Sequence, residues 1–241
     1  MINTFAQIDY LASAGRSPWH RASAISKLGL ALLFVLLAVF TPSWGTLIGL
    51  LVTTLVLCFT AMLPPALIGA AASTPILFSA IFVFAHWKGD WDEPLILLMR
   101  PMVASLTAVW LVGTTPYPDL FAPISRVLPR VVGDSLFLTY RAVFALLARM
   151  ERLWKALFLR GGMTGSPARR VGMMGEAVGT LVLSGFDRSH RLYQTMLLRG
   201  HSGRICGCRH YLARTREDWW VAGIAVWALV LTYVFRAWRP E

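Results

Sequence analysis

Several stretches of the sequence are apolar and uncharged over lengths that few soluble folds tolerate. Residues 44–63 and 66–87 contain no Asp, Glu, Lys or Arg, and a helix needs about 20 apolar residues to cross a bilayer. Residues 28–40, 95–113 and 219–235 form further apolar runs. The whole chain is 56% apolar and 15% charged, against about 45–50% and about 25% in soluble domains. The sequence therefore predicts an all-α polytopic membrane protein with about five transmembrane helices.

Prolines indicate where these apolar runs end or bend. The run Leu28–Phe40 stops before Pro42 and is short for a span, so we expect its helix to begin earlier, near Ala22. Pro64-Pro65 separates the next two runs, because proline breaks a helix from inside. Pro75 lies within the third run. A proline inside a membrane helix is tolerated if a neighbouring helix supplies a hydrogen-bond donor to the carbonyl that the proline leaves free.

The positive charge of the chain is concentrated in one segment. Residues 126–216 hold 16 Lys and Arg against 4 Asp and Glu, a net charge of +12, whereas the whole chain carries +11. A cationic segment between apolar blocks is typical of a cytoplasmic region. We therefore expect N-terminal transmembrane helices over 1–115, a cytoplasmic or interfacial coupling-helix region over 116–216, and a C-terminal transmembrane helix over 217–241. Arg100, near the outer end of its run, is expected to snorkel to water.

The cationic segment begins with an amphipathic pattern. Leu120, Ile124, Val127 and Leu128 share one helical face, which predicts a short interfacial helix ended or bent by Pro129.

Two longer helices should follow. Asp134 can cap one that runs to about Arg160, roughly 40 Å at about 1.5 Å per residue. The next segment, 168–199, has glycines that permit close helix packing but weaken the expectation of one straight helix. They are Gly172, Gly175, Gly179 and Gly185.

Two segments of this region nearly repeat each other. Residues 152–161 read RLWKALFLRG and residues 191–200 read RLYQTMLLRG. Each starts with an arginine (Arg152 or Arg191) and ends in a Leu-Arg-Gly triplet, Leu159-Arg160-Gly161 or Leu198-Arg199-Gly200. Glycine just past a helix and arginine in its last turn are common helix ends. An arginine at an exposed helix tip is also suited to a partner's carboxylate, which it can bind through paired hydrogen bonds.

One cluster of metal-ligating residues follows the second repeat. It consists of His201, Cys206, Cys208 and His210. The Cys-x-Cys spacing is tighter than zinc sites use, and the neighbouring arginines repel a cation. A basic loop with free thiols is the alternative. No P-loop, Gly-x-Ser-x-Gly or His-Glu-x-x-His motif is present, and the spans carry no pair of acids, so we expect a non-catalytic chain without a cofactor of its own.

Further short motifs complete the pattern. They are Ser17-Pro18-Trp19-His20 with Lys27, Leu63-Pro64-Pro65, Thr114-Thr115-Pro116 and Leu138-Thr139-Tyr140-Arg141. Together with the two Arg-Gly helix ends, they resemble the transmembrane (T) component of energy-coupling factor transporters, which are ABC-type importers of metal ions and vitamins. The overall sequence pattern is most similar to that of the cobalt/nickel, CbiQ-like branch. The alanine of the family's Ala-Arg-Gly motif is leucine in both copies here.

The resemblance implies a coupling role in the cytoplasmic membrane of a prokaryote. Arg160 and Arg199, with Gly161, Gly200, Leu159 and Leu198 beside them and Arg152 and Arg191 in support, would each dock on one of two cytoplasmic ATPase subunits. Those subunits would bind ATP and Mg²⁺. A separate membrane subunit would hold the substrate, so this chain need not show a substrate site.

Two other functions stay open from the residues alone. A membrane-embedded enzyme needs polar groups at the depth of the spans. A membrane-anchored basic protein that binds nucleic acid would use the +12 segment and show strongly salt-dependent affinity. The resemblance favours lipid and protein partners over nucleic acid.

Overall fold

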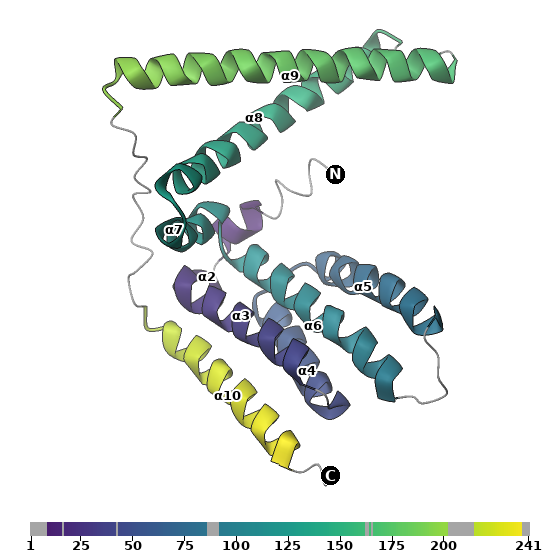
Figure 1. Cartoon of the computed structure of the whole chain (residues 1–241), viewed down its shortest axis with the longest axis vertical. Coiled ribbons are helices and arrows are strands. Elements are labelled where there is room, and N and C mark those ends of the chain that lie inside the picture. Colours follow the sequence, from purple (N-terminus) through teal and green to yellow (C-terminus); the bar gives the residue numbers. More distant parts are fainter. Residues whose placement is uncertain are drawn as a thin grey trace. The chain divides into compact units, whose positions relative to one another are not determined.

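The computed structural model describes residues 9–15, 17–41, 43–85, 92–161, 164, 166–201 and 215–237. Within these ranges the regular elements are all helices (Figure 1), which confirms the all-α class. They are α2 (Pro18–Arg21), α3 (Ala24–Phe40), α4 (Trp44–Thr60), α5 (Pro65–Ala85), α6 (Asp92–Thr114), α7 (Tyr117–Val127), α8 (Arg130–Leu159), α9 (Pro167–Leu198) and α10 (Asp218–Ala237). The chain divides into two compact units, one over 3–123 and 209–241 and one over 124–208 together with residues 1–2.

Four of the described helices are long and apolar enough to cross a membrane. They cover Pro65–Ala85, Glu93–Thr114, Val131–Leu159 and Asp218–Phe235. Two shorter apolar helices cover Ala24–Phe40 and Trp44–Thr60. Every apolar run expected to span is therefore helical. By length and composition α8 meets the same criterion, although the sequence placed it in the cytoplasmic or interfacial region over 116–216.

The expected start of one long helix was wrong. Asp134 does not cap α8, because the helix begins four residues earlier, at Arg130. Pro129 is the N-cap, and its carbonyl accepts from the N–H groups of Val132 at 2.9 Å and Gly133 at 3.2 Å. The four glycines also fail to interrupt α9, which is a single helix of 32 residues. A cost of about 1 kcal/mol per glycine is thus tolerated inside a helix of this length.

The larger unit is a bundle centred on α6. Helices α3, α4 and α5 all pack against α6, and α10 packs against α3 and α4 (Figure 1). Its core is made of fully buried apolar side chains from α3, α4 and α6, namely Phe34, Leu47, Leu50, Val103, Leu106 and Trp110. Gly49 gives α10 room on α4, because a Cβ there would lie 2.9 Å from Leu231.

Pro75 does not break α5, because a neighbouring helix replaces the hydrogen bond that the proline removes. A proline at position 75 leaves the carbonyl of Ala71 without its helical donor. The hydroxyl of Ser105 on α6 donates to that carbonyl at 2.7 Å. The freed backbone group is therefore satisfied inside the bundle, as a helix in lipid requires.

Arg100, which the sequence suggested can snorkel to water, also bonds to backbone. Its guanidinium donates to the carbonyl of Thr41, at the C-terminal end of α3, at 3.0 Å. The side chain is half-buried. A cation at this position satisfies one of the unpaired carbonyls that end a helix and lies at the negative end of the helix dipole.

A buried lysine joins the N-terminal end of α3 to the C-terminal end of α6. Lys27 is 1% exposed, and its Nζ donates to the carbonyl of Thr114, the last residue of α6, at 3.0 Å. Beside it, one carboxylate oxygen of Asp218 accepts from the N–H of Ser23 and the hydroxyl of Ser26, both at 2.8 Å. These bonds tie α3, α6 and α10 together at one end of the bundle.

A small aromatic and histidine cluster lies at the same end. The indole N–H of Trp19 donates to the Thr60 hydroxyl at 3.0 Å, and its ring meets Trp110 edge-on at 6.0 Å between centroids. The Ser17 hydroxyl and the Nδ1 atom of His20 are 2.6 Å apart. Burial, followed by the positive charge of Lys27, lowers the pKa of His20 below its ordinary value.

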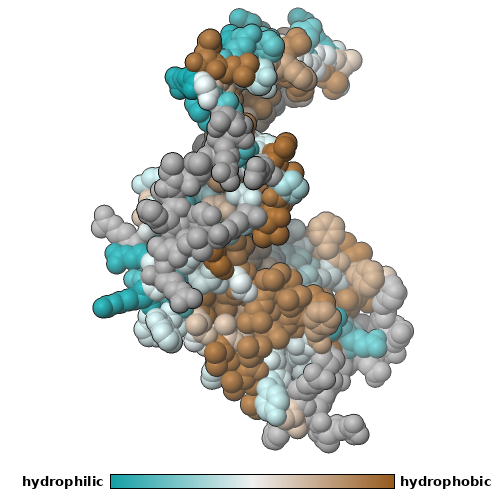
Figure 2. All heavy atoms as spheres, turned by 60° about the vertical axis from the view of Figure 1, so that its left-hand side comes forward, coloured by the Kyte–Doolittle hydropathy of each residue, from teal (hydrophilic) through white to brown (hydrophobic). Residues whose placement is uncertain are grey.

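Apolar side chains also cover much of the outside of this bundle. Figure 2 shows a broad hydrophobic area over its helices. Among the exposed side chains are Phe78, Phe82 and Phe84 of α5, and Trp219, Trp220 and Tyr233 of α10. Apolar surface on this scale is unusual for a soluble monomer and is expected for helices that face lipid.

The second unit consists mainly of α8 and α9. The two helices approach where Gly185 lies opposite Leu146, since a Cβ at Gly185 would sit 3.7 Å from a methyl carbon of Leu146. The other three glycines of α9 have no atoms within 4 Å of the added Cβ. Among the described residues, then, only one of the four predicted packing glycines is used for helix packing.

Candidate coupling site

The first Leu-Arg-Gly triplet forms the end of α8. Arg160 is the C-cap, with φ −83° and ψ 7°, and Gly161 follows with φ +69°. The N–H of Gly161 donates to the carbonyl of Phe158 at 3.1 Å. Glycine is the residue that adopts this left-handed conformation without steric cost, so the sequence ends the helix at this point.

The second triplet ends α9 with the same geometry. Arg199 has φ −88° and ψ 9°, and Gly200 has φ +69°. The N–H of Gly200 donates to the Leu197 carbonyl and that of His201 to the Met196 carbonyl, both at 3.0 Å. This pair of bonds is a Schellman motif. The sequence repeat therefore corresponds to a repeated helix end.

Both helix ends expose apolar side chains next to the arginine. Leu159 is 84% exposed and Leu198 is 88% exposed, and both arginines are exposed as well. In the described part of the chain, neither Arg160 nor Arg199 has an ion-pair partner. A leucine used only to finish a helix would gain stability by packing against it. Two leucines held in solvent beside two unpaired cations instead form surfaces suited to a partner.

The two helix ends lie far apart within their unit. Arg160 precedes the short connection into α9, and Arg199 follows the last residue of α9. The 32 residues of α9 correspond to roughly 48 Å at about 1.5 Å per residue, and the helix is straight (Figure 1). The unit therefore presents two similar contact points, one near each end of α9.

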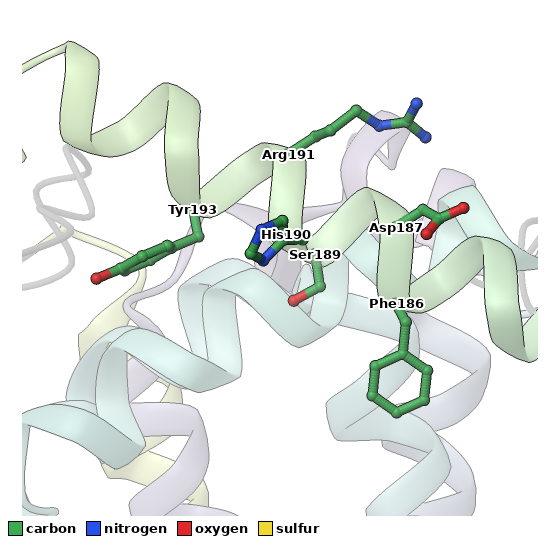
Figure 3. Close-up of a pocket in the computed structure, with 6 residues that line it drawn as sticks. All are labelled: Phe186, Asp187, Ser189, His190, Arg191 and Tyr193. Carbon is green, nitrogen blue, oxygen red and sulfur yellow. The ribbon is translucent and has the colours of Figure 1, made fainter.

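The supporting arginines occupy different surroundings. Arg152 is exposed on α8, one residue after Glu151, which pairs with Lys155 at 2.8 Å. Arg191 lines a shallow hollow on α9 with His190 and Tyr193. Figure 3 shows Arg191 leaving the helix on the same side as Asp187, and Tyr193 pointing elsewhere. Neither arginine is tied to its helix end by an ion pair among the described residues.

The candidate metal ligands cannot be placed together. Cys206, Cys208 and His210 lie outside the described residues, and only His201 lies within them. Among the described residues no group of three His, Cys, Asp or Glu side chains could hold a metal ion.

Some residues that organise the molecule had no clear sequence signal. Lys27 appeared in the sequence only beside the Ser17–His20 motif, whereas it is buried against the end of α6. Asp218 was not singled out by the sequence, and its carboxylate bonds to the start of α3. A single lysine early in an apolar helix was the one available hint, because lysine is almost never fully buried without a partner.

The fold and the helix ends define a multi-pass α-helical membrane protein whose second unit is built mainly on a basic pair of helices. A family model described as cobalt transport protein (CbiQ) matches residues 15–208. The match covers well over half of the sequence and includes both Arg-Gly helix ends. The chain belongs to the CbiQ cobalt transport protein family.

Two further proteins are similar to this chain. The cobalt transport protein CbiQ of Salmonella typhimurium (strain LT2) is 27% identical over 132 residues, which are 52% of this chain and 59% of that protein. An uncharacterized protein of Methanocaldococcus jannaschii is 24% identical over 202 residues, 74% of this chain and 75% of that protein. The match to the Salmonella protein thus spans about three fifths of its length.

Proposed function

We propose that this chain is the transmembrane coupling subunit of an energy-coupling factor importer in a prokaryotic cytoplasmic membrane. It passes the closure of two cytoplasmic ATPase subunits to a separate substrate-binding membrane subunit. The ATPases bind ATP and Mg²⁺, and this chain performs no catalysis. Family membership and the name of the Salmonella relative favour a metal ion, cobalt or nickel, as the substrate over a vitamin.

The observation that carries the proposal is the pair of matching helix ends. Each offers an unpaired arginine and an exposed leucine on a rigid cap, and they are separated by the length of α9. One small partner could not cover both points, whereas two copies of one ATPase subunit could each take one. The arginine would bind a carboxylate through paired hydrogen bonds, and the leucine would fill an apolar hollow beside it.

The α8 and α9 helices are suited to carry force between these points and the membrane. They run unbroken for 30 and 32 residues, so a displacement at one end moves the whole helix. The bundle helices supply a fixed frame, because the Lys27 and Asp218 bonds hold the ends of α3, α6 and α10 together.

Charge reversal at the helix ends tests the proposal. We would co-express the chain with the ABC ATPase and membrane binding subunits of the same organism, and compare the wild type with the Arg160→Glu/Arg199→Glu variant. Loss of one charged partner from a buried pair costs about 2 kcal/mol or more, so ATPase affinity should fall roughly 30-fold or more at each helix end. Pull-down of the ATPases and uptake of ⁵⁷Co²⁺ measure assembly and transport.

The Arg169→Glu/Arg170→Glu variant is the matched control. It makes the same change of charge at two exposed positions in the first turn of α9, close to the first helix end but outside both Leu-Arg-Gly triplets, and should keep assembly and uptake. If the Arg160/Arg199 variant assembles and transports as the wild type does, the coupling role of these residues is wrong. If the control loses assembly equally, the interaction depends on overall charge and not on the helix ends.

A further inference from the structure

A groove lies between α8 and α9, and of its lining residues only Arg191 has been given a part in coupling. It lies within the smaller unit and has a volume of about 410 Å³. This volume falls within the roughly 300–1,000 Å³ typical of small-molecule sites. Both helices line it, including residues around the Gly185–Leu146 approach. The groove is therefore formed by the packing of the pair.

The polar part of the groove is cationic. Arg141 of α8 and Arg188 and Arg191 of α9 line it, and no acidic residue is among its described lining side chains. None of the three guanidinium groups has an ion-pair partner in the described ranges. Arg191 shares its side of α9 with Asp187, four residues earlier (Figure 3), and opposite charges at this helical spacing attract each other. Arg141 and Arg188, one from each helix, are thus the two cations most available to an anion.

The remainder of the groove is mostly apolar. Leu138, Leu146 and Leu192 line it and are only half-buried. A small hydrophilic anion would satisfy the arginines and leave these leucines in water. A ligand with an anionic head and an apolar tail would satisfy both parts.

The surfaces beside the groove favour a lipid over a soluble amphiphile. Near it, α8 exposes Val143, and α9 exposes Val182, Leu183 and Phe186. Helices with exposed apolar residues and several arginines are typical of membrane interfaces, where basic pockets bind anionic headgroups.

We propose that the groove between α8 and α9 binds an anionic phospholipid. The headgroup phosphate lies between the guanidinium groups of Arg141 and Arg188, which suit phosphate because each can donate two parallel hydrogen bonds. The first part of an acyl chain follows Leu138, Leu146 and Leu192. The lipid would join α8 and α9 where they approach each other and would stiffen the pair. Its binding does not require the ATPases.

Native mass spectrometry of the full chain in detergent tests this site. The probes are dioleoylphosphatidylglycerol and dioleoylphosphatidylcholine, which differ in headgroup and charge, and inorganic phosphate in a separate calorimetric titration. We expect one phosphatidylglycerol molecule to be retained at least ~10-fold more strongly than phosphatidylcholine. Each cation near a membrane surface contributes about 1 kcal/mol, so the Arg141→Gln/Arg188→Gln variant should lose most of this preference, and high salt should weaken it.

Two further variants make the result specific. Arg169→Gln/Arg170→Gln removes the same charge outside the groove and should keep the preference. Arg141→Lys/Arg188→Lys keeps the charge and should retain part of it. Circular dichroism establishes whether each variant folds. If the glutamine variant does not fold, the lysine variant tests the site.

Several results would overturn the proposal. Equal retention of the two lipids by the wild type would remove the anionic site. Inorganic phosphate at millimolar concentration displacing phosphatidylglycerol would show a free-anion site. Unchanged lipid preference in the Arg141/Arg188 variant, combined with loss of ATPase assembly, would show that the groove binds an acidic protein segment.

Discussion

The left-handed glycine at the end of α9 gives a prediction whose sign and size follow from geometry. Gly200 has φ +69°, and nothing lies within 4 Å of a Cβ added there. A Gly200→Ala substitution therefore meets no neighbouring atom, and its cost is the backbone strain of an L-residue in this conformation, about 1–2 kcal/mol. If the chain avoids that strain by leaving the conformation, the caps to Leu197 and Met196 are lost instead, at about 0.5–1.5 kcal/mol each.

Hydrogen exchange at the helix end measures this cost directly. The amides of residue 200 and of His201 donate the two capping bonds, so their exchange reports the local opening. A loss of about 1–2 kcal/mol should speed exchange at these amides roughly 5- to 30-fold, while the middle of α9 stays as protected as in the wild type.

Gly172→Ala is the matched control, because Gly172 lies inside the same helix with open space around its Cβ and no positive φ. Alanine there should stabilise α9 by about 0.5–1 kcal/mol. The same glycine-to-alanine substitution should thus destabilise the helix end at position 200 and stabilise the helix at position 172. Unchanged or slower exchange at the Gly200→Ala helix end would refute the assignment of a strained, glycine-dependent cap.

Three further predictions concern the larger unit. Ser105→Ala leaves the carbonyl of Ala71 without a donor and should lower the unfolding free energy in detergent by about 1–3 kcal/mol; an unchanged melting temperature would contradict this. Lys27→Met keeps an unbranched side chain one atom shorter but removes the donor to Thr114, so thermal unfolding should show a loss of at least about 1.5 kcal/mol; wild-type stability would mean that the buried cation costs as much as its bond contributes. Because the pKa of His20 is lowered in the folded state, stability from this group is present above the unfolded pKa of about 6.5 and falls as pH drops below it; a His20→Asn variant should lose this pH dependence, and an equal slope in both proteins would exclude His20 as its source.

The sequence predicted most of the fold because the membrane imposes simple rules. Uncharged runs of sufficient length, such as 66–87, must become helices, since no other open structure satisfies its backbone in lipid. Each expected run is a helix in the structure, and the family was identified from short motifs between the runs. The two Arg-Gly ends were also visible, because glycine past a helix end has a definite conformational reason.

Long-range polar contacts were beyond the reach of the sequence. Arg100 near a span end was expected to reach water, and no sequence pattern indicates that the Thr41 carbonyl, 59 residues earlier, lies within its reach. Lys27 and Asp218 are separated by almost the whole chain, and their roles depend on which helix ends meet. The glycines of α9 failed as a signal for the opposite reason: small residues permit packing but do not require it, and three of the four have no neighbour among the described residues.

The docking roles of Arg160 and Arg199 rest on a different kind of inference. Their caps and exposure are visible in the structure, but a contact with another protein depends on the shape of that partner. The roles of these arginines therefore stay predictions until the ATPases are tested. The α8–α9 groove had no sequence signal at all, because its arginines come from two helices whose crossing point was unknown.

The hydrogen bond from Ser105 to Ala71 also bears on how the chain is made. When α5 emerges from the ribosome, Pro75 leaves the Ala71 carbonyl unpaired, and exposure of such a group to hydrocarbon costs several kcal/mol. Its donor arrives only 34 residues later, with α6. We therefore expect α5 to remain beside the translocon, or in contact with water, until α6 follows. The two helices would then enter the bilayer together as a hairpin.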